Sequence, residues 1–236
     1  MTPENKKLAF RIYLYLGALF ITSLVVSNLI FQKFFYWNPF GDVKVFGAPL
    51  FEISVGILPY PITFLITDLI SEIFGKKKAN QIIIAGIFAS VFSMGIVYVA
   101  SVVPATSWSP IEDDIFLEVF GKTILAVGAS MIAYLLAQFV DVHLFHFWKK
   151  LTKGKHLWLR NNFSTFLSQF VDTFTVLTLL CYFGEIEWQR FSGLLVGGFL
   201  FKVLVAFFDT PFLYFFVYLL RKRFGLKMGE EINLDI

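Results

Sequence analysis

The chain has 236 residues, of which 57% are hydrophobic, 19% are aromatic and only 16% are charged, against roughly 25% charged residues in soluble domains. This composition excludes a soluble globular protein, and no recognised nucleic-acid-binding motif supports nucleic acid as a partner. No Walker motif or glycine-rich phosphate loop occurs, so we expect no ATP hydrolysis by this chain alone and no cofactor.

The first apolar stretch, residues 12–31, follows Lys6, Lys7 and Arg11. It is too long for a signal-peptide core and lacks a small-residue cleavage site, so we expect it to remain as a transmembrane helix. Five more stretches have the roughly twenty residues that a helix needs to cross a membrane. They cover residues 53–74, 82–103, 123–147, 163–183 and 191–220. The prediction is an all-α integral membrane protein, a bundle of six transmembrane helices that forms one domain over residues 1–236.

The basic residues are distributed unevenly between the two sides of this bundle. Fifteen of the twenty Lys and Arg residues lie in the N-terminal segment, in residues 75–80 and 148–160, and after residue 220. The other side has only Lys33, Lys44, Lys122 and Arg190. Because cytoplasmic flanks collect Lys and Arg, both termini are predicted to be cytoplasmic.

The longest connection, residues 32–52, contains the turn-forming residues Pro39, Gly41, Gly47 and Pro49. This segment fits either a small external lid or a plain connector.

Two carboxylates occur inside the second apolar stretch. A spacing of four places Phe64, Asp68 and Glu72 on one helical face, each a turn from the next. An ionised side chain at the centre of a membrane helix costs roughly 2.5–3.5 kcal/mol, so such groups normally face a bundle interior or a wet cavity. We interpret this face as the lining of a pore or pocket. The alternative for Glu72, which is close to Gly75 and residues 76–78, is a position at the cytoplasmic surface.

The tetrapeptide Gln-Phe-Val-Asp occurs in both the fourth and the fifth stretch, with Gln138 and Asp141 in one and Gln169 and Asp172 in the other. Each amide lies about 13 Å from the cytoplasmic end of its helix, so the two are predicted to lie at one depth. The last stretch adds Lys202 and Asp209 at a spacing of seven, on one face, where an ion pair would lower the cost of burying them. Pro211 is expected to kink that helix.

The predicted interior therefore has several acids and a single deep base. Carboxylates beside amides suit a neutral heterocycle whose edge displays N–H and NH2 groups, such as a guanine-like edge. Phe64, Phe139 and Phe170 could stack on such a ring. The three histidines, His143, His146 and His156, lack carboxylate or thiolate neighbours at ligand spacing, so no metal site is predicted.

An ordered set of these residues resembles the queuosine precursor transporter family, also called the vitamin uptake transporter family. The set comprises Asn28, Lys33, Pro61, Asp68, Glu72, Gly75, Gln138, Asp141, Arg160, Ser164, Gln169, Asp172, Lys202 and Pro211. The resemblance implies a multi-pass protein of the bacterial inner membrane. It also implies uptake of a 7-deazapurine into the cytoplasm: 7-cyano- or 7-aminomethyl-7-deazaguanine, or the base queuine.

Predicted site residues combine the helical faces with this resemblance. The substrate-binding candidates are Asn28, Phe64, Asp68, Glu72, Gln138, Asp141, Ser164, Gln169 and Asp172, and the supporting charges are Arg160, Lys202 and Asp209. Lys202 is expected to act as a counter-charge that keeps the neighbouring acids ionised, with Asp209 as its partner.

Three functional hypotheses remain from the sequence. The first is a stand-alone secondary transporter or facilitator. The second is a substrate-binding subunit of an energy-coupling-factor type transporter, which needs an ATPase partner and which the family also resembles. The third is an intramembrane enzyme, for instance a hydrolase using Asp68 and Asp141, but no adjoining catalytic motif supports it and we expect no enzymatic activity. The coupling ion and a homodimer are left open.

Overall fold

The computed structural model describes residues 2–37, 39, 41, 44–45, 48–120, 124–153 and 155–234. Its helices are α1 (Pro3–Ile30), α2 (Tyr60–Ile73), α3 (Lys76–Val102), α4 (Asp113–Phe120), α5 (Ile124–Leu151), α6 (Leu157–Tyr182) and α7 (Trp188–Phe224). Within this described part, six helical segments are long and apolar enough to cross a membrane. The prediction of an all-α membrane protein with six spanning helices is confirmed. Lys122, which was predicted to lie on the side opposite the termini, is outside the described residues. Residue 123, the predicted start of the fourth helix, is also outside them.

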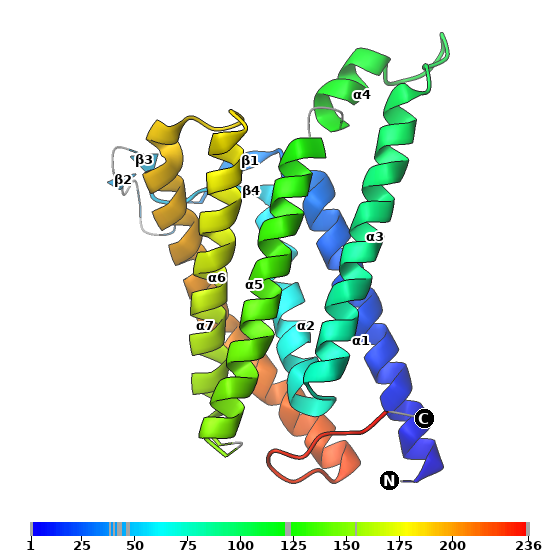
Figure 1. Cartoon of the computed structure of the whole chain (residues 1–236), viewed down its shortest axis with the longest axis vertical. Coiled ribbons are helices and arrows are strands. Elements are labelled where there is room, and N and C mark those ends of the chain that lie inside the picture. The colour runs from blue at the N-terminus through cyan, green and yellow to red at the C-terminus, as the bar shows by residue number, and fades with distance from the viewer. Residues whose placement is uncertain are drawn as a thin grey trace.

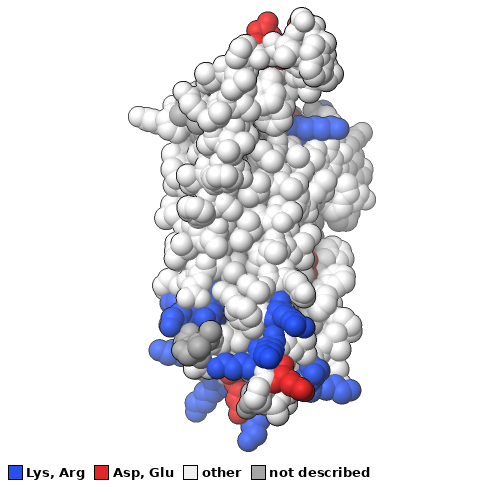
Figure 2. All heavy atoms as spheres, turned by 90° about the vertical axis from the view of Figure 1, so that its right-hand side faces the viewer, with Lys and Arg blue, Asp and Glu red and all other residues white. Residues whose placement is uncertain are grey.

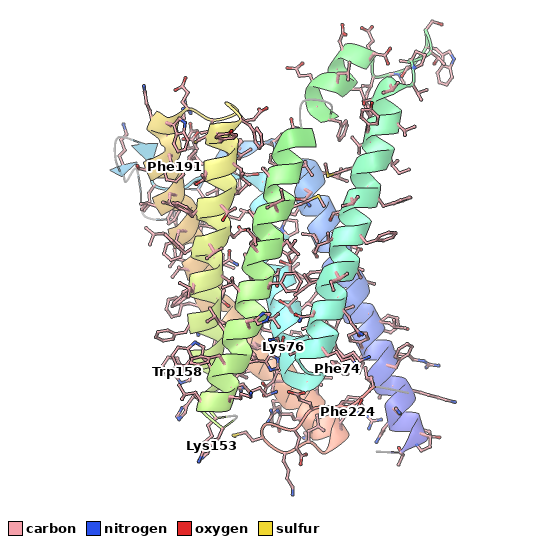
Figure 3. All side chains as sticks on the ribbon, in the orientation of Figure 1. Phe74, Lys76, Lys153, Trp158, Phe191 and Phe224 are labelled. Atoms are coloured by element: carbon pink, nitrogen blue, oxygen red, sulfur yellow. The ribbon has the colours of Figure 1, made fainter. Side chains whose placement is uncertain are left out.

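Both termini lie at one end of an elongated bundle (Figure 1). α1 runs away from that end, α2 returns to it, and α3, α5, α6 and α7 then alternate in direction. Lys and Arg side chains gather at the end that carries the termini, and a tall, almost uncharged surface rises above them (Figure 2). Trp158 and Lys153 lie near this terminal end, and Phe191 lies near the opposite end (Figure 3).

α6 has its polar face inward and its apolar face outward, the reverse of a helix in a soluble protein. Its buried residues include Asn161, Asn162, Ser164, Thr165, Ser168, Gln169, Asp172 and Thr173. Its exposed residues include Phe163, Leu167, Phe170 and Phe174. This arrangement is expected when the outer surface contacts lipid. Polar side chains then face the interior of the bundle, where they can find hydrogen-bond partners, and apolar side chains face the lipid. Phe170 therefore points out of the bundle, and the expectation that it stacks on a ligand in the interior is wrong.

α2 is the central helix and is shorter than predicted. Ten of its fourteen residues are buried, and it contacts α1, α3, α5 and α7. The predicted helix over residues 53–74 is wrong in its first part, where β4 (Glu52–Ser54) and the 3-10 turn η1 (Val55–Ile57) precede the helix. Antiparallel pairing of Glu52–Ser54 with Phe34–Tyr36 explains the difference, because it holds the start of the predicted helix in extended geometry. At 1.5 Å per residue, α2 spans about 21 Å, less than a bilayer core of about 30 Å.

α7 is longer than its predicted range and continues through Pro211. Its last turn carries Arg221, Lys222 and Arg223, and Gly225 caps it in the left-handed conformation. Both features stabilise a helix C-terminus.

The segment before α2 folds as a cap at the end of the bundle opposite the termini. β1 (Phe34–Tyr36) pairs antiparallel with β4, and β2 (Lys44–Val45) pairs with β3 (Ala48–Pro49). The cap approaches α7 closely: a Cβ atom on Gly197 would lie 2.2 Å from the carbonyl oxygen of Leu50. Residues 38, 40, 42, 43, 46 and 47 of this segment lie outside the described residues. The remainder supports the lid prediction over the plain connector.

Candidate functional site

A cavity of about 180 Å³ lies between the cap, α1, α5, α6 and α7. The cap residues in its wall place it in the half of the bundle away from the termini. Its polar wall residues are Ser27, Asn28, Glu52, Ser54, Tyr60, Ser130, Tyr134, Asp172, Thr173 and Lys202. We call this space the main cavity. Its wall contains the charged residues Glu52, Asp172 and Lys202.

Asp172 and Lys202 form an ion pair in the wall of the main cavity. The Lys202 ammonium donates to Oδ2 of Asp172, and both side chains are largely buried. The same ammonium lies 4.6 Å from the centre of the Tyr60 ring, a cation–π distance. Asp172 thus lines the cavity as a carboxylate whose charge is balanced by Lys202.

Three aromatic rings pack together beside this ion pair. The Tyr60 ring lies 5.3 Å from Phe64 and 5.4 Å from Tyr134, measured between ring centres. Gln138 Nε2 donates to the Tyr134 hydroxyl at 2.6 Å. Tyr60 and Tyr134 offer the main cavity both apolar ring surface and hydroxyl groups, a combination that suits a flat polar heterocycle.

A smaller cavity of about 20 Å³ adjoins the main one and shares Ile57 and Lys202 with it. Its wall also contains Gln169 and Asp209. This volume is enough for one water molecule. The Gln169 Oε1 atom has no hydrogen-bond partner among the described residues, so the small cavity has an unused acceptor in its wall.

Asp68 of α2 and Asp141 of α5 face each other on the terminal side of the cavities. Their carboxyl groups lie within hydrogen-bonding reach of each other. Ser168 donates to Asp141 Oδ1 at 2.9 Å, and Ser164 lies beside the same carboxyl group. Asp68 Oδ1 and Asp141 Oδ2 have no hydrogen-bond partner in the described part of the chain.

Glu72 lies one turn further along α2 in a different environment. Arg160 approaches it with two nitrogens, at 2.7 and 3.3 Å, and Arg221 donates to Glu72 Oε1. Lys149 adds a third cation at 3.7 Å. Glu72 is thus the centre of an ion cluster that ties α2 to α5, α6 and α7.

The chain after α7 folds back over this ion cluster. Glu231 accepts from Lys149 at 2.7 Å, and the Ile232 backbone N–H donates to the Ile73 carbonyl at 2.7 Å. Ile232 and Leu234 are buried against the bundle core. Charge pairs below α2 and this strap, residues 226–234, therefore cover the terminal end of α2.

The structure separates the predicted site residues into three levels. Asn28 and Asp172 line the main cavity, and Phe64 and Gln169 line the smaller one. The remaining candidates lie in the wall of neither cavity: Asp68, Glu72, Gln138, Asp141 and Ser164. For these five, substrate contact stays a prediction from the sequence.

The expected partner of Lys202 is wrong. Lys202 pairs with Asp172 across the α6–α7 interface, whereas Asp209 lines the smaller cavity. A spacing of seven on one helix separates two residues by about 10 Å, so the neighbouring helix supplies the nearer acid. The expected supporting charge Arg160 is bound to Glu72.

Sequence reasoning missed Tyr60 and Tyr134, although their positions carry a signal. Tyr60 lies four residues before Phe64 on α2, and Tyr134 lies four residues before Gln138 on α5. Each is one turn further along a helical face that was already singled out. Extending those faces toward the cap would have found both.

The profile of the family described as "Putative vitamin uptake transporter" matches residues 54–216 of the chain. The chain belongs to the vitamin uptake transporter family. This family is the one that the ordered set of residues resembles. The residues of this chain that match the family include α2, α5, α6 and most of α7, and therefore most of the wall of the main cavity.

Two curated relatives of this family member match most of its length. The "Queuosine precursor transporter" of Escherichia coli (strain K12) is 28% identical over 189 residues, which are 78% of this chain and 80% of the relative. The "Probable queuosine precursor transporter" of Bacillus subtilis (strain 168) is 24% identical over 173 residues, 73% of each chain. No solved structure matches the chain.

Proposed function

We propose that this protein is a stand-alone transporter of the bacterial cytoplasmic membrane that takes up a queuosine precursor of the 7-deazaguanine class. The main cavity carries the proposal, because it combines a balanced carboxylate with two tyrosine rings inside a membrane bundle. Membership of the family and the names of its relatives supply the class of substrate.

Recognition is centred on Asp172. A guanine-like edge presents an N–H and an NH2 group side by side, and a carboxylate accepts from both. Lys202 balances the charge of Asp172 and is itself a donor for a ring carbonyl. The rings of Tyr60 and Tyr134 then provide the faces on which the bicyclic base stacks.

The uneven distribution of basic residues supports the direction of uptake. Lys and Arg gather at the end that carries the termini (Figure 2), and cytoplasmic flanks normally collect them. Both termini are then cytoplasmic, and the main cavity lies in the outer half of the membrane. The ion cluster around Glu72 and the strap lie between this cavity and the inner side, which supports entry of the substrate from outside.

Uptake by lipid vesicles that contain only this chain tests the proposal. Labelled 7-cyano-7-deazaguanine is expected to enter the vesicles and to be recovered unaltered. Asp172→Asn is expected to abolish this uptake, because the amide nitrogen points a donor at the donors of the substrate edge. Lys44→Met, on the exposed strand β2, is a matched control that removes a cation outside the cavity.

The other outcomes separate the competing hypotheses. Uptake that requires an added ATPase would indicate a substrate-binding subunit, and recovery of a modified substrate would indicate an enzyme. Equal uptake by the wild type and by Asp172→Asn would show that the main cavity does not bind the substrate.

A further inference from the structure

Four carboxylates in the membrane helices are almost completely buried. The exposed fractions are 2% for Asp68, 1% for Glu72, 0% for Asp141 and 5% for Asp172. Glu72 and Asp172 each form ion pairs with buried cations. No lysine or arginine of the described ranges forms an ion pair with Asp68 or Asp141, which instead face each other. These two acids are buried without the compensation that the other two receive.

Two carboxylates in contact and away from water cannot both be ionised, because their repulsion and their burial both favour a neutral form. A proton shared between them makes one group a donor and the other an acceptor, and the hydrogen-bonding reach between Asp68 and Asp141 fits that state. The hydroxyl of Ser168 stabilises the acceptor.

Other polar groups around the pair also lack partners. Gln138 is completely buried and lies one turn before Asp141 on the same face of α5, and its Oε1 atom has no hydrogen-bond partner among the described residues. Thr165, on α6, is in the same situation and lines the smaller cavity. Buried polar atoms without a partner mark places where a proton or a water molecule is bound in part of the working cycle.

A polar route joins this pair to the main cavity. Lys202 lines both cavities, Asp209 lines the smaller one, and the charge of Asp209 acts on Asp68. The charged groups that face Asp68 from the surrounding helices are Asp141 of α5, Arg160 of α6 and Asp209 of α7. Arg160 is bound to Glu72 in this arrangement and also acts on Asp68 as a nearby positive charge.

We propose that Asp68 and Asp141 form a proton-binding site that is distinct from the substrate cavity and couples uptake to the proton gradient. The coupling rests on the proposed transport function. A proton enters from the outer side through the smaller cavity and is shared by the two carboxyl groups. When the Glu72 ion cluster opens, Arg160 is released, its charge favours the ionised pair, and the proton leaves toward the cytoplasm. The substrate itself is unchanged.

Infrared difference spectroscopy of the purified protein tests the site without any substrate. The wild type is expected to show the deuterium-sensitive band of a protonated buried carboxyl group at neutral pH. Asp68→Asn and Asp141→Asn should each remove it, because the amide replaces the shared proton as donor and keeps the fold. Asp172→Asn is the matched control and should retain the band, because Asp172 is paired with Lys202.

Three results would overturn the site: no such band in the wild type, a band that survives both Asp68→Asn and Asp141→Asn, or a band that sodium ions remove. In vesicles, an imposed pH gradient should drive accumulation by the wild type, whereas Asp68→Asn should only exchange substrate across the membrane. Failure of the wild type to take up substrate would refute the proposed function, and the infrared result would still decide the proton site.

Discussion

The two ends of the bundle differ in how their buried carboxylates are neutralised. At the terminal end, Glu72 meets Arg160, Arg221 and Lys149, and the strap covers the cluster. Toward the cap, Asp172 pairs with Lys202, and the pair borders a cavity of about 180 Å³. At the terminal end, cations from three helices neutralise one carboxylate. Toward the cap, one lysine neutralises one carboxylate, and both groups lie in the wall of the main cavity.

The difference shows that spacing on a helix does not fix the role of an acid. Asp68 and Glu72 share one face of α2, yet one faces a second carboxylate and the other faces three cations. The partner helices decide which acid is locked in an ion cluster and which can exchange a proton. Changes that exploit this contrast should affect stability at the terminal end and ligand affinity near the cap.

The largest effect is expected at the ion cluster. Glu72→Gln leaves the guanidinium of Arg160 buried without a counter-charge, and breaking such a pair costs about 3–5 kcal/mol. Thermal unfolding of the purified variant should show a large fall in melting temperature. Glu231→Gln is the matched control, because the Glu231 side chain is 41% exposed and an exposed pair contributes at most about 1 kcal/mol. Equal melting temperatures for the two variants would show that the Glu72 ion cluster does not stabilise the terminal end.

A smaller effect, on affinity rather than stability, is expected at the cavity end. Asp172→Asn should weaken substrate binding by about 1–3 kcal/mol, or roughly 5- to 150-fold, because buried donors lose their acceptor. Calorimetric titration with 7-cyano-7-deazaguanine measures this loss. Lys202→Met should reduce affinity as well, and the double variant should lose less than the sum because the two residues act as a pair. Additive losses would show that they act separately.

The smallest effect concerns the turn between α2 and α3. Gly75 has a φ of 85°, and a Cβ atom there would lie 2.2 Å from Glu231 Oε2. Gly75→Ala should destabilise the protein by about 1–2 kcal/mol through backbone strain, since the Glu231 side chain can move aside. Gly95→Ala, in open space on α3, should instead stabilise it by about 0.5–1 kcal/mol. Urea unfolding of both variants measures the change in the free energy of unfolding. A stabilising effect of Gly75→Ala would contradict the left-handed backbone conformation at Gly75.

Periodicity and apolar length were sufficient to predict the six helices and both termini at one end, because membrane insertion imposes these features locally. The break before α2 was less visible. Residues 53–58 are apolar enough for a helix, and the strand at Glu52–Ser54 depends on its pairing with β1, a contact that the local sequence does not contain.

The site was predicted unevenly for the same reason. Faces of single helices grouped Asp68 with Glu72 and Lys202 with Asp209, but ion pairs form between helices. Helix-to-helix register decides that Lys202 meets Asp172, and a single sequence does not specify that register. Tyr60 and Tyr134, in contrast, were accessible from periodicity and were missed because the predicted faces stopped one turn short.

The central claim is that the main cavity, rather than the acids nearer the termini, holds the substrate. A structure determined with bound 7-cyano-7-deazaguanine tests it most directly. The account predicts that the base lies against the rings of Tyr60 and Tyr134, with its donor edge on Asp172 and with Asp68 and Asp141 still facing each other. A base bound between Asp68 and Glu72, with the Tyr60 side of the cavity empty, would contradict it.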